Sequence, residues 1–229
     1  RTDNHTQINA QTIAELEPDL KDRFSKALFY QDEAHIDPRL TMQALSQKLK
    51  ALKVDIHYNS DMSSINNGAD NEITIDARGF SAKDTLTNLR GVRGEMLLLQ
   101  AKDINITRPI RLIHPRFPVY IVPRENNVYM VGATQIESEQ QGGVSARGMV
   151  DLLNAAYAIH PAFADATILE MGADVRPAFP DNLPKLKWID NTLYINGLFR
   201  HGFLLSPACA KMAADTILDR TYIPEFMDA

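Results

Sequence analysis

The sequence of 229 residues predicts a mixed α/β fold, in part α+β, with two structural regions. Helix and strand patterns alternate near both ends of the chain, as they do in α/β units. Between these ends lies a block of strand patterns separated by short turns, which is typical of an antiparallel sheet. We therefore expect the chain to cross between the two regions more than once.

Composition indicates a globular protein and argues against several partners. Hydrophobic residues make up 45% of the chain and charged residues 23%, so a chain of this length can form a sizeable core. The net charge of -5 and the scattered Lys and Arg argue against a nucleic-acid partner. No apolar run is long enough to span a bilayer. The single cysteine, Cys209, fits a reducing compartment and an apolar, buried setting, so we expect a cytoplasmic protein without a membrane partner.

Strand patterns account for much of the chain. The expected strands and their turns lie, in order, within residues 27–36, 54–59, 66–79, 92–101, 108–115, 117–136 and 193–198. The segment 117–136 is expected to form a hairpin, because the polar run Glu125–Asn127 joins two strand-like halves.

Helix patterns occur in four segments, which are residues 9–20, 37–53, 145–163 and 206–220. Asp37 is a suitable N-cap for the second helix, and Pro38 occupies its first helical position. The apolar residues that repeat there at helical spacing are Leu40, Ala44, Leu45, Leu49 and Leu52. Ser145 is the expected cap of the third helix, and Pro207 stands in the first turn of the fourth.

Sequence motifs argue against several kinds of site. The six histidines do not form a metal-ligand spacing with one another, with cysteine or with glutamate. The chain has no G-x-S-x-G elbow, although a Ser-His-Asp triad can assemble from distant residues. It also has neither a G-x-G-x-x-G loop nor a Walker A motif. We therefore expect no metal site.

Arg176 is a candidate ligand for a carboxylate. Pro177 favours an extended backbone at Arg176, and such a stiff segment can direct a guanidinium at a carboxylate through two parallel hydrogen bonds. From these residues alone, a surface arginine or a structural ion pair is the simpler interpretation. In the same way, Tyr120 reads first as a half-buried sheet residue, and Arg124 as a solvated charge at a turn.

The stretch 194–210 joins a strand to a helix. Gly197 and Gly202 permit a positive φ or a close approach of the backbone. The helix that follows directs N–H groups and a partial positive charge towards this turn. Arg200 adds to that field, so an electron-rich group would be stabilised here. A tight turn with two solvated polar residues, Arg200 and His201, explains the same residues equally well.

Six segments follow one another in an order that is specific as a combination. They are HIDPRLTMQAL, DARGF, LRGVRGEM, YIVPRENNVYMVGATQIES, GADVRPAFPDNLPKL and INGLFRHGFLLSPA. Together they resemble the family of FAD-dependent glycine oxidases and D-amino-acid oxidases, and most closely bacterial glycine oxidases of thiamine biosynthesis. The resemblance covers about residues 16–218. It implies a partial Rossmann-like FAD-binding domain interleaved with an antiparallel-sheet substrate domain.

The resemblance also implies how the chain is divided. Residues 30–90 and 171–229 would belong to the FAD-binding side, and residues 1–29 and 91–170 to the substrate-binding side. The family's strand–GxGxxG–helix element, which holds the pyrophosphate of FAD, has no counterpart in the sequence. We therefore expect a preceding segment of roughly a hundred residues, in the same protein or supplied separately. Assembly into a homo-oligomer is left open.

Individual residues take roles from the resemblance. Arg176 matches the arginine that binds the substrate carboxylate, and Tyr120 and Arg200 match residues near the substrate. Gln135 occupies a pocket position, where a polar side chain can change the preference for substrate side chains. The positions that match contacts to the cofactor are Leu198, Phe199, Arg200, His201, Gly202, Phe203, Leu204, Gly79 and Met62.

The implied activity is the oxidation of the Cα–N bond of glycine or another small amino acid. In such a reaction the Cα hydrogen leaves as hydride to the flavin, the imine is hydrolysed, and oxygen is reduced to hydrogen peroxide. One alternative is a related flavin amine oxidase that acts on sarcosine or D-amino acids. Another is a flavin-free fragment or binding module without activity of its own.

Overall fold

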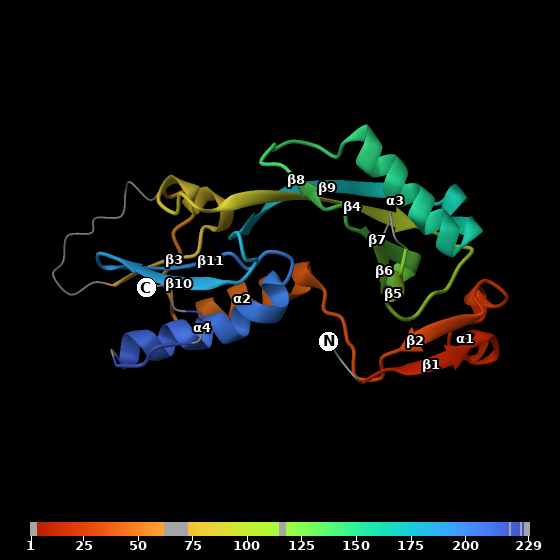
Figure 1. Cartoon of the computed structure of the whole chain (residues 1–229), viewed down its shortest axis with the longest axis horizontal. Coiled ribbons are helices and arrows are strands. Elements are labelled where there is room, and N and C mark those ends of the chain that lie inside the picture. The colour runs from red at the N-terminus through yellow and green to blue at the C-terminus, as the bar shows by residue number, and fades with distance from the viewer. Residues whose placement is uncertain (1–3, 62–72, 115–117, 220, 225, 227–229) are drawn as a thin grey trace. The chain divides into compact units, whose positions relative to one another are not determined.

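The computed structural model describes residues 4–61, 73–114, 118–219, 221–224 and 226 (Figure 1). The fold is mixed α/β, as predicted, and forms two compact units. Unit 1 consists of Arg1–Asp37, Arg93–Ile136 and Gln141–Asp174, and unit 2 of Pro38–Val92, Glu137–Gln140 and Val175–Ala229. The chain thus crosses between the units several times. The assignment of residues to an FAD-binding and a substrate-binding side stays a prediction.

Unit 1 contains a two-stranded and a larger sheet. The first is antiparallel and pairs β1 with β2, and the second has the order β5-β6-β7-β4-β8, with β9 also pairing with β4. The strands are β1 (Thr6–Asn9), β2 (Lys26–Phe29), β4 (Arg90–Gln100), β5 (Ile110–Leu112), β6 (Val119–Arg124), β7 (Val128–Gly132), β8 (Ile136–Glu137) and β9 (Thr167–Ala178). Strands β4 and β9 begin in one unit and end in the other. The helices are α1 (Ala10–Leu16) and α3 (Ala146–Ile159), with 3-10 turns at Pro18–Leu20, Glu125–Asn127 and Pro161–Asp165.

The hairpin β6–β7 and the helix α3 confirm two sequence predictions. At the turn between the strands, Asn126 and Asn127 have φ of 61° and 54°, the left-handed conformation that tight hairpins need and asparagine tolerates. The side chain of Ser145 caps α3 by accepting a hydrogen bond of 3.0 Å from the Gly148 N–H. The helix ends at Ile159, with His160 as its C-cap, because Pro161 cannot donate a further backbone hydrogen bond.

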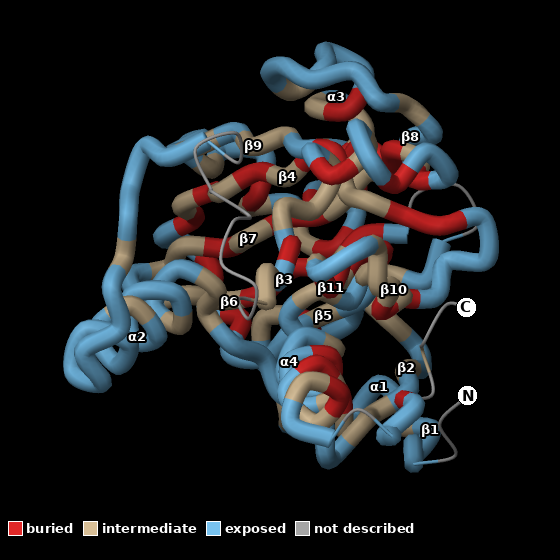
Figure 2. Tube along the Cα trace, turned by 90° about the vertical axis from the view of Figure 1, so that its left-hand side faces the viewer, coloured by how far each residue is buried: buried red, intermediate tan, exposed pale blue. Residues whose placement is uncertain are grey.

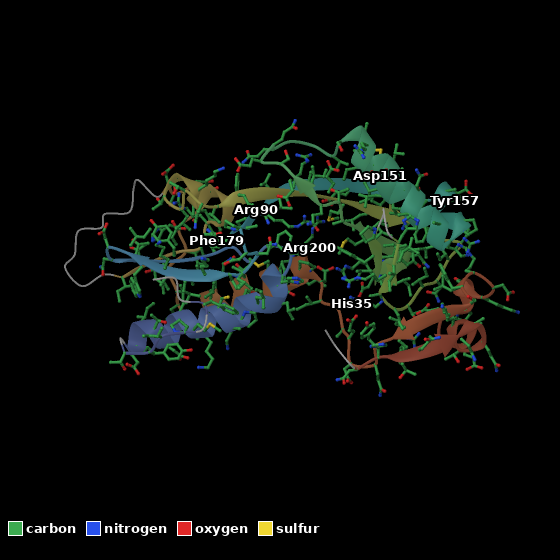
Figure 3. All side chains as sticks on the ribbon, in the orientation of Figure 1. His35, Arg90, Asp151, Tyr157, Phe179 and Arg200 are labelled. Atoms are coloured by element: carbon green, nitrogen blue, oxygen red, sulfur yellow. The ribbon has the colours of Figure 1, made fainter. Side chains whose placement is uncertain are left out.

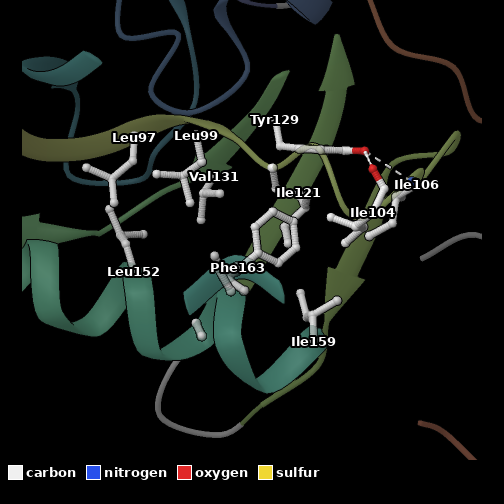
Figure 4. Packing of buried hydrophobic residues seen from close by; sticks show 14 of the residues in the cluster. Leu97, Leu99, Ile104, Ile106, Ile121, Tyr129, Val131, Leu152, Ile159 and Phe163 are labelled. Carbon is white, nitrogen blue, oxygen red and sulfur yellow. Dashed lines mark hydrogen bonds between the residues drawn. The ribbon is translucent and has the colours of Figure 1, made fainter. Parts of the chain in front are cut away.

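The core of unit 1 lies between one face of the larger sheet and α3 (Figure 4). Strand alternation places every second residue on this face, and the fully buried ones include Leu97, Leu99, Ile121 and Val131. The Tyr129 hydroxyl donates to the Ile104 carbonyl at 2.8 Å and accepts from the Ile106 N–H at 3.2 Å. These bonds satisfy a polar group that would otherwise be costly to bury. The opposite face is only half-buried at Met96, Leu98, Tyr120 and Met130.

Unit 2 is built on a three-stranded sheet with the order β10-β11-β3. Its elements are α2 (Pro38–Ala51), β3 (Thr74–Asp76), a 3-10 helix (Gly79–Asp84), β10 (Lys185–Ile189), β11 (Thr192–Asn196) and α4 (Gly202–Leu218). Strands β10 and β11 form an antiparallel hairpin, whereas β11 and β3 are parallel. Two small apolar clusters stabilise the unit, one of Ala82, Leu86, Leu89, Phe179 and Tyr194, and one of Leu186, Leu193 and Ala213.

The apolar stripe of α2 is exposed. The helix is confirmed, but none of its residues is buried in the described part of the chain, and Figure 2 draws it in pale blue and tan. Leu40 is 64% exposed and Leu45 is 51% exposed. Helical periodicity shows that one face is apolar, but it does not show which element covers that face.

Two element predictions were wrong. Residues 54–59 form no strand, although their side chains alternate. Helix α4 begins at Gly202 rather than near Ser206, so Pro207 lies inside it. A proline in the second turn removes only one backbone hydrogen bond, which the rest of this 17-residue helix accommodates.

Cys209, on α4, is buried as predicted, and burial raises the pKa of its thiol. In the described residues, no helix combines the length and the apolar character needed to cross a membrane.

Candidate functional site

The parallel strands β3 and β11 end side by side in unit 2. Tyr194 is paired with Asp76, the last residue of β3, and β11 ends two residues later at Asn196. In open α/β sheets, ligands bind outside the carboxyl ends of parallel strands. The buried side chain of Asn196 joins the two exits, because its Nδ2 donates to the Gly79 carbonyl at 2.8 Å and its Oδ1 accepts from the Gly197 N–H at 2.8 Å.

The turn after β11 has a backbone that depends on glycine. Gly197 has a φ of +78°, and an added Cβ would lie 2.2 Å from Cδ2 of the buried Phe179, which is labelled in Figure 3. Phe199 has a φ of 49° without being glycine, which costs an L-residue about 1–2 kcal/mol. Its N–H donates to the Pro177 carbonyl at 3.1 Å. Strained backbone of this kind persists where surrounding contacts hold it, and it is frequent at functional sites.

This hydrogen bond brings two of the predicted site residues near each other. Arg176 directly precedes Pro177 in the extended strand β9, as its sequence predicted, and its side chain is half-buried. Arg200 directly follows Phe199, is exposed, and is labelled in Figure 3. The backbone segments that carry the two arginines are therefore joined at one point of unit 2.

The N-terminus of α4 presents free donors at the same turn. The first intrahelical bond runs from the Leu205 N–H to the His201 carbonyl at 2.8 Å, so the N–H groups of residues 202–204 have no acceptor within the helix. The side chain of the N-cap residue His201 makes no capping hydrogen bond, and the first turn of the helix contains no acidic residue. Among the described residues, a Cβ added at Gly202 would meet no atom within 4 Å beyond its chain neighbours and its own helix backbone. Open space, N–H donors and a partial positive charge suit an electron-rich ring edge.

A salt-bridge network that sequence reasoning missed fixes the exit of β3. The buried Asp76 accepts from the N–H of Arg78 at 3.0 Å and from its Nε at 2.8 Å. The same guanidinium donates twice to Asp84, at 3.0 and 3.1 Å, and these hydrogen bonds lower the pKa of Asp84. Gly79, with a φ of +63°, lies inside this network. The spacing D-x-R-x5-D was the available signal.

Tyr120 and Gln135 belong to unit 1. Tyr120 is paired with Gly132 across β6 and β7, and a Cβ at Gly132 would lie 2.9 Å from the tyrosine hydroxyl. The ring can lie there because position 132 has no side chain. Gln135 follows three residues after Gly132 and is exposed. The structure thus places both residues at one end of the hairpin.

The remaining predicted positions have different outcomes. Met62 lies outside the described residues. Arg124 was interpreted as a solvated charge, but its side chain is 14% exposed and its Nε pairs with Asp37 at 3.1 Å. Among the described residues, no group of three or more His, Cys, Asp or Glu is arranged to hold a metal ion. That the arginines of unit 2 and the tyrosine of unit 1 form one site stays a prediction.

The match to a family model shows that the protein is a flavin-dependent enzyme. Residues 2–216 match the family model described as FAD dependent oxidoreductase, and the chain belongs to this family. FAD is therefore the cofactor. The described residues fit the ring end of FAD at the start of α4, whereas the sequence contains no G-x-G-x-x-G loop for its pyrophosphate.

Known relatives agree with this assignment. A Rhizobium etli protein, provisionally named thiamine biosynthesis oxidoreductase ThiO, is 46% identical over 98% of this chain and 68% of its own. A protein of Bacillus licheniformis named glycine oxidase is 26% identical over 97% of this chain and 65% of its own. The crystal structure of glycine oxidase from Bacillus cereus superimposes with a TM-score of 0.81, at 21% identity, over 94% of this chain and 65% of that one. The chain thus spans about two thirds of the length of these proteins.

Proposed function

We propose that the protein oxidises the Cα–N bond of glycine or another small amino acid, in the branch of metabolism that makes thiamine. The observation that carries this proposal is the hydrogen bond between the Phe199 N–H and the Pro177 carbonyl. It joins the strand of Arg176, a carboxylate ligand, to the turn of Arg200 and the uncapped start of α4. The likeness to ThiO over nearly the whole chain supports the thiamine assignment.

In this proposal, Arg176 holds the substrate by its carboxylate. A guanidinium offers two parallel N–H donors, and so fixes both the position and the orientation of a carboxylate. Pro177 keeps the Arg176 backbone extended, and Arg176 lies in β9, which pairs with β4. Tyr120, Arg200 and Gln135 are proposed to line the rest of the substrate pocket and to help to orient the substrate, as the residues that they match in the family do. Orientation of this kind is the main contribution of a protein to a cofactor-driven reaction.

FAD, when bound, supplies the acceptor for the hydride that leaves Cα, and oxygen finally takes the two electrons as hydrogen peroxide. The residues that would hold its ring end are those of the turn Leu198–Leu204 and Gly79. The free N–H groups at the start of α4 would stabilise negative charge at the ring edge. Neutral or cationic first-turn residues are required for this role, and α4 has no acidic residue there.

Replacing Arg176 with alanine in the full-length protein tests the proposal. Loss of a bidentate carboxylate contact is expected to cost at least ~2 kcal/mol of transition-state binding, a drop in kcat/KM for glycine of about 30-fold or more. The measurement is peroxide release under a range of glycine concentrations. Arg147→Ala on α3 is the matched control, because the Arg147 side chain is 92% exposed and should leave kcat/KM unchanged. An unchanged value for Arg176→Ala would refute the assignment.

Two further measurements decide between the alternatives. A panel of glycine, sarcosine and D-amino acids separates a glycine oxidase from a related flavin amine oxidase, and the polar Gln135 is a reason to include secondary amines. An absorbance spectrum of the purified protein shows whether flavin bands at about 450 nm are present. Their absence after reconstitution with FAD would favour a binding module without oxidase activity.

A further inference from the structure

Glu95 is a fully buried carboxylate in β4, on the face of the sheet that α3 covers. Its Oε1 accepts from the Ser145 N–H at 2.8 Å and from the Arg93 Nε at 3.2 Å. Its Oε2 accepts from the hydroxyls of Ser145 and Thr134 at 3.2 and 3.3 Å. Four donors on one carboxylate offset the large cost of burying its charge.

Thr134 is bound to Glu95 by three hydrogen bonds. Besides the hydroxyl contact, the Thr134 hydroxyl accepts from the Glu95 N–H at 2.9 Å, and the Thr134 N–H donates to the Glu95 carbonyl at 3.1 Å. Backbone and side chain of Thr134 are both held, although residues 133–135 belong to no strand. The next residue is Gln135, and two residues before Thr134 is Gly132, against which the Tyr120 ring lies.

We propose that Glu95 is a positioning residue for the substrate: through Thr134 it fixes the backbone that presents Gln135 and the Gly132 surface under Tyr120. The proposal rests on the proposed function, because it takes these residues as part of the substrate pocket. Glu95 itself touches neither substrate nor cofactor. Its effect is therefore on how tightly the substrate is held, and less on the rate of the reaction once the substrate is bound.

A purely structural role for Glu95 makes a different prediction. The carboxylate also holds Ser145, the cap of α3, and Arg93 in turn donates to the Gly142 and Gly143 carbonyls. If Glu95 served only to hold α3 in place, breaking its contact with Ser145 would change KM and the melting temperature in the same way as breaking its contact with Thr134. The two contacts can be separated by substitution.

The test compares substitutions on the two sides of the carboxylate, in the full-length protein with FAD. Thr134→Val removes the hydroxyl but keeps a similar shape, and is expected to raise KM for glycine roughly tenfold with kcat within about twofold. Thr134→Ser retains the hydroxyl and should restore a KM near that of the parent. Ser145→Ala removes a donor to the same carboxylate and the cap of α3, so it should lower the melting temperature while leaving KM unchanged.

Hydrogen–deuterium exchange of the peptide that contains residues 133–136 gives a readout independent of turnover. The backbone amide of residue 134 should exchange faster in Thr134→Val than in the parent or in Ser145→Ala. An unchanged KM in Thr134→Val, or an equal rise in Ser145→Ala, would overturn the positioning role. Lack of turnover of any small amino acid by the parent protein would instead refute the proposed function, and the positioning role with it. Glu95→Gln is a further variant. If it fails to fold, the comparison of Thr134→Val with Thr134→Ser still tests the positioning role.

Discussion

Replacing Gly197 with alanine tests whether the turn after β11 is built as described. The φ of +78° costs an L-residue about 1–2 kcal/mol. The new Cβ would lie 2.2 and 2.6 Å from two ring carbons of Phe179, which is 3% exposed and cannot swing into solvent. Overpacking of this kind costs about 1–3 kcal/mol. The expected loss is therefore about 2–5 kcal/mol of unfolding free energy, measured by urea unfolding with FAD present.

Gly202→Ala is the matched control for this substitution. Its Cβ would meet no atom of the described residues within 4 Å beyond its chain neighbours and its own helix, and alanine is a better helix former than glycine, so the unfolding free energy measured without FAD should be unchanged or slightly higher. If the ring end of FAD takes that open space, the added methyl should weaken FAD binding at least about fivefold, as read by flavin fluorescence. A Gly197→Ala protein as stable as the parent would refute the account of the turn. A Gly202→Ala protein with the parent's FAD affinity would refute the placement of the cofactor.

Three more substitutions probe the rest of the chain. Burial alone would raise the pKa of Glu95, but the hydrogen bonds from Ser145 and Arg93 outweigh it and lower the pKa. The charge of Glu95 therefore stabilises the fold above the ordinary glutamate pKa of about 4.3 and loses this effect as pH falls through the lowered value. Urea unfolding at a series of pH values should show the stability gap between the parent and Glu95→Gln narrowing in acid; a constant gap would contradict this. Leu97→Ala in the core should cost about 2–5 kcal/mol, whereas Leu45→Lys on exposed α2 should stay within about 0.5 kcal/mol, both measured by thermal melting.

Local rules predicted most helices and the antiparallel hairpin, because caps and turns are encoded in neighbouring residues. Ser145 and Glu125–Asn127 were read correctly for this reason. The start of α4 was predicted too late in the chain, because Pro207 was taken to mark the first turn of the helix. A proline is also tolerated in the second turn, where Pro207 lies. Strand β10, the first strand of the hairpin with β11, was not predicted. Its apolar residues Leu186 and Trp188 alternate with lysines and precede a polar Asp-Asn turn.

Burial and pairing were less predictable, because they depend on which distant segment comes near. The leucines of α2 have a helical period, but nothing local states that their face is exposed. Residues 54–59 alternate like a strand, yet in the described part of the chain no strand pairs with them. The network of Glu95 joins residues up to 50 positions apart, a distance over which single residue types give no signal. The network of Asp76 is local, and its spacing was a signal that sequence reasoning did not use.

The hydrogen bonds of Thr134 also determine which mutations the neighbouring position 135 can tolerate. The three hydrogen bonds that hold it use only Thr134 and Glu95, so none depends on the side chain at position 135. If Gln135 faces the substrate, as proposed above, a mutation there alters the surface offered to a substrate while the backbone beneath it stays fixed. On that proposal, a substitution at position 135 can change the substrate preference without breaking any of the three hydrogen bonds that hold Thr134.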